Sequence, residues 1–161
     1  MHWGLTPANR LIADISRSTG ARVGDVVALS AQQLQRAKSA AGWLTYTEAK
    51  TGKERTIRLT AAQLRGCERF CKGEWVFPHR TNKARHRTVD AVRRNMQRFA
   101  KDSGMRREGV SPHSWRKVYA VNLFRETGDL EAVQRSLNHR YESTTMAYAF
   151  ADKLSKPQKK A

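Results

Sequence analysis

Apolar residues in the first part of the chain recur with the spacing of amphipathic helices. Thr6 and Pro7 are typical of an N-cap and a first helical residue, and Gly20 is well placed to end a helix. The apolar positions between them are Leu11, Ile12 and Ile15. A second, short helix is expected after Arg22, and its apolar residues are Val23, Val26, Val27 and Leu29. The pattern therefore predicts two helices separated by a glycine stop.

From residue 42 the pattern changes to that of a β-hairpin. Residues 42–50 (GWLTYTEAK) are rich in aromatic and β-branched residues, TGKE supplies a turn, and RTIRLT returns as a second strand. The predicted hairpin spans residues 42–59, and its turn region carries Lys50 and Lys53. A short apolar run at residues 74–77 predicts one more edge strand.

The remaining segments predict helices. Thr60 is a candidate N-cap for a helix over residues 61–73, and another helix is expected from about Thr88 to Gly104. Three more are predicted: from Ser111 and Pro112 to Gly128, after Asp129, and after Ser143 around Tyr148. The expected fold class is therefore α+β, mostly helical, with a small antiparallel sheet. We expect one domain over residues 1–154 and a basic, flexible tail over residues 155–161.

The net charge of the chain limits the possible classes of function more than it limits the possible folds. The 161 residues include 31 Lys and Arg against 14 Asp and Glu, which gives a formal net charge of +17. Such self-repulsion is typical of a protein whose partner is a polyanion, and nucleic acid is the leading candidate. Two cysteines are too few for a disulfide framework, and no apolar stretch is long enough for a membrane span or a secretory signal. We therefore expect a cytoplasmic protein that binds nucleic acid.

Positive charge is concentrated in residues 79–117, which contain 12 Lys and Arg against three acidic residues. We expect this stretch to face DNA, because cations along one surface neutralise backbone phosphates. The candidate DNA-binding residues are Lys53, Arg80, Lys83, Arg85, Arg87, Arg93 and Lys117.

A group of residues suited to phosphate chemistry is spread over the chain. His113 and Arg116 are three residues apart at a predicted helix start, where free backbone amides and the helix dipole attract an anion. His139 and Tyr148 are nine residues apart in the segment LNHRYESTTMAYAF. Upstream, Arg22 follows a glycine stop and Lys50 lies in the hairpin turn, so the chain offers several cations, two histidines and a tyrosine.

In this order and spacing, the residues resemble the catalytic domain of the tyrosine recombinases, also called phage-type integrases. The family typically shows a Gly-x-Arg segment with an acidic residue three later, a hairpin lysine, an H-x-x-R helix, and an LGH segment nine residues before a tyrosine. The matching residues here are Gly20, Arg22 and Asp25; Lys50 to Lys53; His113 and Arg116; and Leu137, Asn138, His139 and Tyr148. Asn138 replaces the usual glycine of the LGH segment. The family's N-terminal core-binding domain has no counterpart, so we expect an isolated catalytic domain.

The resemblance implies a site-specific recombinase that cleaves and rejoins DNA through a 3′-phosphotyrosyl intermediate. Tyr148 would be the nucleophile, and Lys50 would protonate the leaving oxygen. Arg22 and Arg116 can each present a planar fork to two phosphate oxygens as negative charge builds up. His113 would act in proton transfer near Tyr148 and His139 would donate a hydrogen bond to a nonbridging oxygen, while Asp25 would orient the Arg or His residues. No carboxylate cluster suited to magnesium lies near these motifs, so the reaction is expected to need no metal, cofactor or ATP.

Two alternatives stay open beside this interpretation. A type IB topoisomerase or telomere resolvase would share the chemistry, and a non-catalytic DNA-binding regulator could keep the fold. The resemblance implies a homo-tetramer on double-stranded DNA, whereas a net charge of +17 and a short apolar C-terminal segment favour a monomer without DNA. It also implies DNA integration or a related rearrangement by a mobile element, in the cytoplasm of a bacterial or phage-infected cell near the nucleoid.

Overall fold

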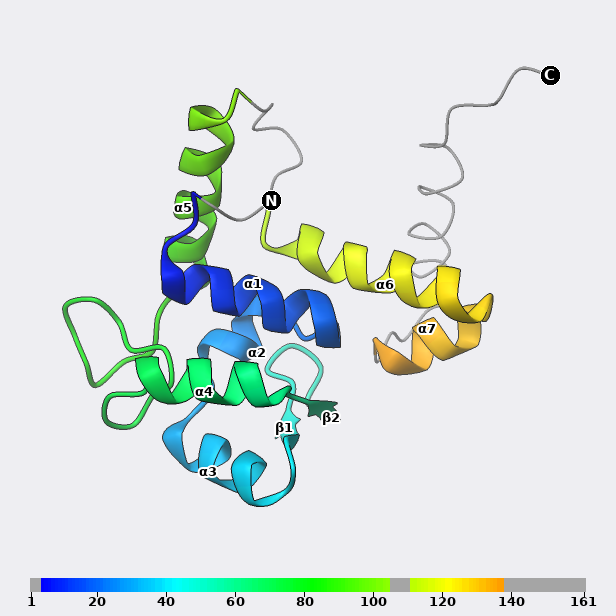
Figure 1. Ribbon diagram of the computed structural model, residues 1–161, viewed down its shortest axis with the longest axis horizontal. Coiled ribbons are helices and arrows are strands. Elements are labelled where there is room, and N and C mark those ends of the chain that lie inside the picture. Colours follow the sequence, from blue (N-terminus) through cyan, green and yellow to red (C-terminus); the bar gives the residue numbers. More distant parts are fainter. Residues whose placement is uncertain (1–3, 105–110, 138–161) are drawn as a thin grey trace.

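The protein is a mostly helical α+β fold with one small antiparallel sheet, as a computed structural model that describes residues 4–104 and 111–137 shows (Figure 1). The elements in chain order are α1 (Pro7–Thr19), α2 (Val23–Val27), α3 (Ala31–Ser39), β1 (Trp43–Thr47), β2 (Glu54–Arg58), α4 (Ala61–Phe70), α5 (Val89–Asp102), α6 (His113–Thr127) and α7 (Leu130–Ser136). The predicted fold class is confirmed.

Most helix ends follow the capping residues that the sequence offers. Ser30 and Thr60 each form a capping box with the glutamine three residues later, at the starts of α3 and α4. Helix α1 begins at Pro7 and ends at Gly20, whose φ of +67° is the left-handed conformation that favours glycine. Thr6 is the N-cap residue, but its side chain makes no capping bond, and its amide donates to Asn95 Oδ1 at 3.0 Å.

The hairpin pairs β1 with β2 in a register that sets Trp43 opposite Arg58 and Thr47 opposite Glu54. Burial alternates along both strands, so one face of the hairpin packs on the core and the other faces solvent. The predicted edge strand at residues 74–77 is wrong as part of this sheet. That segment lies beside the start of α3, where Val76 N–H donates to Leu29 C=O at 2.9 Å and Trp75 forms only isolated bridges. Its backbone groups are therefore paired away from the hairpin.

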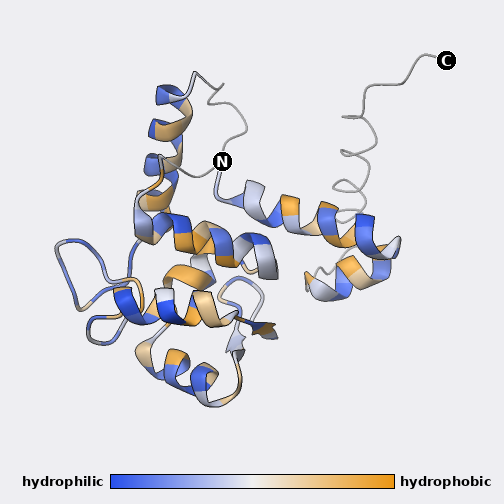
Figure 2. Cartoon of the chain, viewed as in Figure 1, coloured by the Kyte–Doolittle hydropathy of each residue, from blue (hydrophilic) through white to orange (hydrophobic). Residues whose placement is uncertain are grey.

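Helix α1 lies in the middle of the molecule and packs against α2, α4 and α6 (Figure 1). Its inner face belongs to the main hydrophobic core, which also takes in α2 and the inward residues of the hairpin. Figure 2 shows α2 as mostly hydrophobic and the long connection between α4 and α5 as mostly hydrophilic. A second, smaller cluster of Ala120, Val133 and Leu137 joins α6 to α7. The α6–α7 pair thus has a core of its own and meets the rest of the fold along α1.

Gly20 is fixed by both backbone conformation and packing. A Cβ at this position would overlap the ring of Tyr119 on α6, whose hydroxyl is 2.5 Å from Ser136 Oγ on α7. Gly128, which ends α6 with a φ of +66°, has open space around it instead. The two glycines therefore share a conformation and differ in their surroundings.

We predict that Gly20→Ala lowers the free energy of unfolding by about 2–3 kcal/mol and Gly128→Ala by about 1 kcal/mol. Both variants strain the backbone, but only Gly20→Ala also displaces Tyr119 and its hydrogen bond. Chemical denaturation of the two variants beside the wild type measures the difference. Equal losses would show that Tyr119 yields without cost and that Gly20 serves only its backbone conformation.

Candidate functional site

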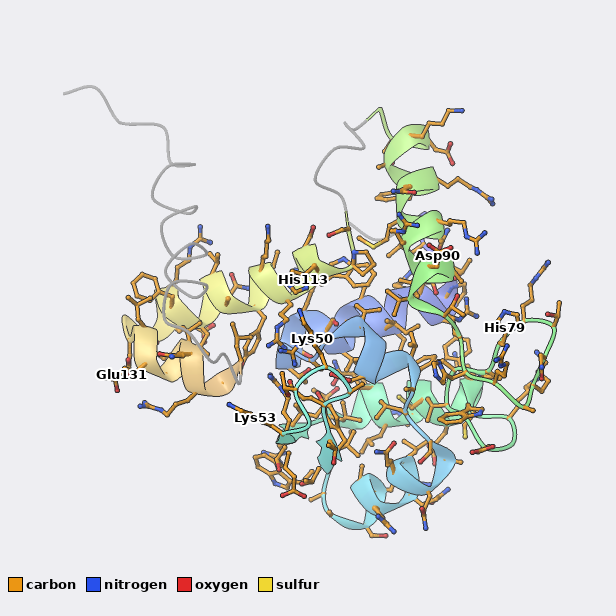
Figure 3. The ribbon with its side chains drawn as sticks, turned by 180° about the vertical axis from the view of Figure 1, so that it is seen from behind. Lys50, Lys53, His79, Asp90, His113 and Glu131 are labelled. Carbon is orange, nitrogen blue, oxygen red and sulfur yellow. The ribbon has the colours of Figure 1, made fainter. Side chains whose placement is uncertain are left out.

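A tight turn between β1 and β2 presents Lys50. Glu48 N–H donates to Lys53 C=O at 2.9 Å, and Gly52 N–H donates to Glu48 C=O at 2.9 Å. Gly52 takes the left-handed conformation that this turn requires, with a φ of +67°. Lys50 is exposed within the turn, and Figure 3 shows it close to His113 at the start of α6.

Arg22 lies just before α2 and is paired with a buried carboxylate in the hairpin. Its Nη1 atom is 2.5 Å from Glu48 Oε1, and its side chain is 17% exposed while that of Glu48 is fully buried. Burial on its own would raise the pKa of the Glu48 carboxyl. Hydrogen bonds from Arg22 and Thr51, and the charges of Arg22 and Arg55, outweigh it and lower that pKa below its ordinary 4.5.

Arg116, in the first turn of α6, is the largest fully buried side chain among the described residues. Its Nη1 donates to the carbonyl of Gly20 and its Nη2 donates to the carbonyl of Leu137. Burial, together with the positive charges of Arg22 and Arg55, lowers the pKa of its guanidinium to about 10. The group therefore stays charged at neutral pH and joins the ends of α1 and α7.

His113 is exposed at the first position of α6. Partial desolvation by the surrounding protein lowers the pKa of its imidazole below the ordinary 6.5. The positive charges that lower it further are those of Arg116, Lys117, Arg22 and Lys50. These four cations thus lie near enough to act on one imidazole, which is neutral at pH 7 and able to accept a proton.

Asp25 in α2 accepts a hydrogen bond from the hairpin turn. Its Oδ1 accepts from Ala49 N–H at 3.0 Å, next to Lys50, and its buried Oδ2 has no hydrogen-bond partner among the described residues. Burial is the main cause that raises the pKa of this carboxyl above its ordinary 3.8. Asp25 therefore ties the start of α2 to the backbone beside the hairpin lysine.

Arg22, Asp25, Lys50, His113 and Arg116 form one cluster with two residues that the sequence analysis missed, Glu48 and Arg55. Arg55 is buried on β2, where its Nη2 donates to Thr19 C=O at 2.7 Å and its Nη1 lies 3.5 Å from Glu48 Oε1. Strand alternation is a signal that could have found both, because it places Glu48 on the inward side with Tyr46, and Arg55 with Ile57.

The predicted DNA-binding residues fall into two regions. Lys53 and Lys117 are exposed near the cluster, on the hairpin and on α6, while Arg80, Lys83 and Arg85 are exposed on the α4–α5 connection. Figure 3 shows His79 and Asp90, which mark this connection and the start of α5, well away from Lys50 and His113.

Several of these cations have partners within the chain. Arg87 is half-buried and its Nη1 donates to Asn9 Oδ1 at 3.3 Å, while Arg93 pairs with Asp90. Lys83 Nζ donates to the carbonyls of His79 and Arg80 at 3.2 and 3.0 Å. Arg87 in particular is held by an internal contact.

His139 and Tyr148 lie outside the described residues. Leu137, the last described residue before them, has its carbonyl held by Arg116. The described part of the site therefore contributes Arg22, Lys50, His113 and Arg116, with Glu48 and Asp25 as acids among them. Such a set of side chains is chemically suited to binding an anionic group and to stabilising negative charge that develops on it.

The structure thus places cations from three separate segments beside one exposed imidazole, on a mostly helical domain with one hairpin. The chain belongs to the phage integrase family, whose family model matches residues 5–154. No helix among the described residues has both the length and the apolar character to cross a membrane.

Similar curated proteins carry names from the same family. Tyrosine recombinase XerD of Rhizobium meliloti (strain 1021) is 30% identical over 145 residues, which cover 85% of this chain and 45% of that protein. Tyrosine recombinase XerC of Shewanella amazonensis is 27% identical over 158 residues, with 92% and 51% covered. The integrase of Escherichia phage P2 is 26% identical over 141 residues, with 88% and 37% covered. The chain spans about half the length of the curated relatives it matches.

Solved structures share the fold. The XerH site-specific recombinase bound to palindromic difH substrate, in its post-cleavage complex, has a TM-score of 0.68 at 23% identity, with 88% of this chain and 41% of that chain covered. A lambda integrase (75–356) dimer bound to a COC′ core site has a TM-score of 0.69 at 22% identity, with 95% and 55% covered. These likenesses confirm the predicted fold.

We predict that Glu48→Gln destabilises the fold by about 3 kcal/mol at neutral pH, because it leaves buried guanidinium groups without their counterion. Since the folded-state pKa of Glu48 is below 4.5, its ionised carboxylate stabilises the fold above that pH. This contribution is lost as the pH falls through the lower folded-state value, so the difference between wild type and variant should shrink in acid. Chemical denaturation over a pH series measures it.

Asp25→Asn is the control for this series, because the pKa of Asp25 is shifted the other way. A raised folded-state pKa gives a contribution that is present below 3.8 and lost as the pH rises through the folded-state value. The difference in stability between wild type and Asp25→Asn should therefore change with pH in the direction opposite to the difference between wild type and Glu48→Gln. A difference between wild type and Glu48→Gln that does not change with pH would show that the charge of Glu48 does not stabilise the cluster.

Proposed function

We propose that this chain is the catalytic domain of a site-specific DNA recombinase, acting through a 3′-phosphotyrosyl intermediate without metal or ATP. The observation that carries the proposal is the convergence of Arg22, Lys50, His113 and Arg116 from separate segments on one site, in the order of the family's motifs. The names of the relatives, and the DNA substrates in the titles of the solved structures, support it.

The proposed first step is attack by the Tyr148 hydroxyl oxygen on the phosphorus of one DNA strand. The new bond joins tyrosine oxygen to phosphorus, the bond from phosphorus to the 5′-oxygen breaks, and the phosphodiester energy is kept in the phosphotyrosine. Rejoining is the same exchange in reverse, with a 5′-hydroxyl as nucleophile. The charge on the nonbridging oxygens would be stabilised by Arg22 and Arg116, together with a hydrogen bond from His139. This is the chemistry of type IB topoisomerases.

Two protons must move in this step. The proton of Tyr148 would pass to His113, whose imidazole is neutral at pH 7 because its pKa is lowered by desolvation and nearby cations. The leaving 5′-oxygen would receive its proton from Lys50, which the turn presents beside the site. Asp25 would support this step by holding Ala49, the neighbour of Lys50.

The proposal covers residues 1–154 as the catalytic domain and residues 155–161 as a basic tail. The partner is a double-stranded recombination site, contacted by the exposed cations described above, inside a bacterial or phage-infected cell. Strand exchange joins two duplexes and uses four active sites, so we propose a homo-tetramer on DNA. At a net charge of +17, subunits repel one another without the polyanion, which favours a monomer in its absence.

We predict that the chain forms a covalent adduct with DNA through Tyr148. The probe is a pool of nicked duplexes with randomised arms, in which cleavage releases a short strand with a 5′-hydroxyl. Because this strand diffuses away, rejoining cannot occur and the adduct is trapped. Denaturing electrophoresis should show a shifted protein band for the wild type and none for Tyr148→Phe. Tyr141→Phe is the matched control and should keep the band. A band of normal intensity from Tyr148→Phe would rule out the assigned nucleophile.

We predict that Lys50→Ala slows adduct formation by about 10²–10⁴-fold, the usual contribution of a general acid. Lys53→Ala, which removes the same charge from the same hairpin, should slow it far less. A duplex with sulfur in place of the 5′-bridging oxygen has a leaving group that needs no proton, so it should restore Lys50→Ala to near the wild-type rate. Equal slowing on the oxygen and sulfur duplexes would mean that Lys50 holds DNA instead of donating a proton.

A further inference from the structure

Glu48 occupies an unusual position for a carboxylate in so basic a chain. It directly follows β1, on the inward side of the hairpin, and its side chain is fully buried. A buried carboxylate is costly unless cations and hydrogen bonds compensate it. Its partners therefore show what this position is built to hold.

The two oxygens of this carboxylate hold different parts of the site. Oε1 lies 2.5 Å from Arg22 Nη1 and 3.5 Å from Arg55 Nη1. Oε2 accepts from Thr51 Oγ1 at 2.7 Å, and the same Thr51 oxygen accepts from Lys53 N–H at 3.3 Å. One rigid group thus connects an arginine guanidinium with the turn that carries Lys50.

No other acid among the described residues replaces Glu48 in this role. Asp25 is the other buried acid, but its hydrogen bond goes to the backbone of Ala49, and burial raises its pKa. Arg55 is anchored independently by the carbonyl of Thr19. Arg22 has no such second anchor within residues 4–104 and 111–137, so its guanidinium depends there on Glu48 for its place.

We propose that Glu48 is a positioning residue for DNA cleavage: its carboxylate holds the Arg22 guanidinium and, through Thr51, the Lys50 turn in one fixed arrangement. This inference rests on the function proposed above. Glu48 does not touch the reacting atoms in this scheme, and it acts by keeping two cations aligned with one phosphate. Misplacement of such groups by about 1 Å can cost about 10²-fold in rate.

The test compares adduct formation by Glu48→Gln with that by Glu54→Gln, using duplexes captured by the wild-type chain from the nicked pool. Glu54 is exposed on β2, so its variant changes the net charge equally without entering the cluster. Glu48→Gln should slow cleavage at saturating DNA by about 10- to 100-fold and leave the DNA dissociation constant within about threefold of the control. The oxygen and sulfur duplexes should both be affected, because Arg22 acts on the phosphate whichever atom leaves.

A double-variant cycle distinguishes positioning from a general loss of structure. In an Arg22→Ala background, Glu48→Gln should slow cleavage by less than about threefold, since the group that it positions is gone. Thr51→Val keeps the charge of Glu48 and releases only the turn, so it should slow the oxygen duplex by about fivefold and leave the sulfur duplex unaffected. If Glu48→Gln does not fold, the Thr51→Val variant tests the positioning role of Glu48 on its own.

Three outcomes would overturn the inference. The first is a wild-type cleavage rate for Glu48→Gln, and the second is a loss of rate that multiplies with that of Arg22→Ala. The third is a Thr51→Val variant that slows cleavage of both duplexes equally or of neither. A wild-type chain that captures no DNA from the pool would instead contradict the proposed function. The two failures are therefore distinguishable.

Discussion

The close packing of three guanidinium groups, two buried and one 17% exposed, is the constraint on which the site depends. Arg22, Arg55 and Arg116 come from different segments of the chain. The positive charges of Arg22 and Arg55 act on Arg116 and lower the pKa of its guanidinium. Like charges in a partly desolvated region repel strongly, so their positions must be fixed by acceptors that the fold supplies. Among the residues that the structure describes, Glu48 is the carboxylate that directly pairs with two of them.

Two further acceptors come from the C-terminal end of α1. Thr19 C=O accepts from Arg55 and Gly20 C=O accepts from Arg116, in the region where a helix leaves its carbonyls unpaired and its dipole is negative. The same helix end is therefore both a termination signal and a cation-binding site. Because these arginines come from β2 and α6, the glycine stop also fixes how the hairpin and the α6–α7 pair meet α1. Fold and site share one set of hydrogen bonds.

This dual use explains what the sequence could and could not predict. Capping residues and strand alternation act over a few residues, so Gly20, Thr60 and the hairpin were predicted correctly from local pattern. The segment at residues 74–77 was predicted as a sheet strand because its composition suits one. Its pairing with the residues before α3 depends on tertiary packing that no local pattern encodes. Glu48 and Arg55 were overlooked because a charged residue in a hairpin is usually exposed, and only the partner across the fold makes its burial favourable.

At the buried position 116 of α6, arginine is better suited than lysine because its ordinary pKa is higher. Burial and neighbouring charges lower the pKa of Arg116 to about 10, which leaves it charged at neutral pH. A lysine starts from a pKa of about 10.4, so a comparable shift would bring that pKa much nearer to neutral pH, and lysine has only three donors on one nitrogen. Arg116 spends one donor on each of two carbonyls and still has N–H groups left over. A guanidinium can therefore join two helix ends and, in the proposed reaction, also meet a phosphate, whose negative charge would relieve the repulsion among the three arginines.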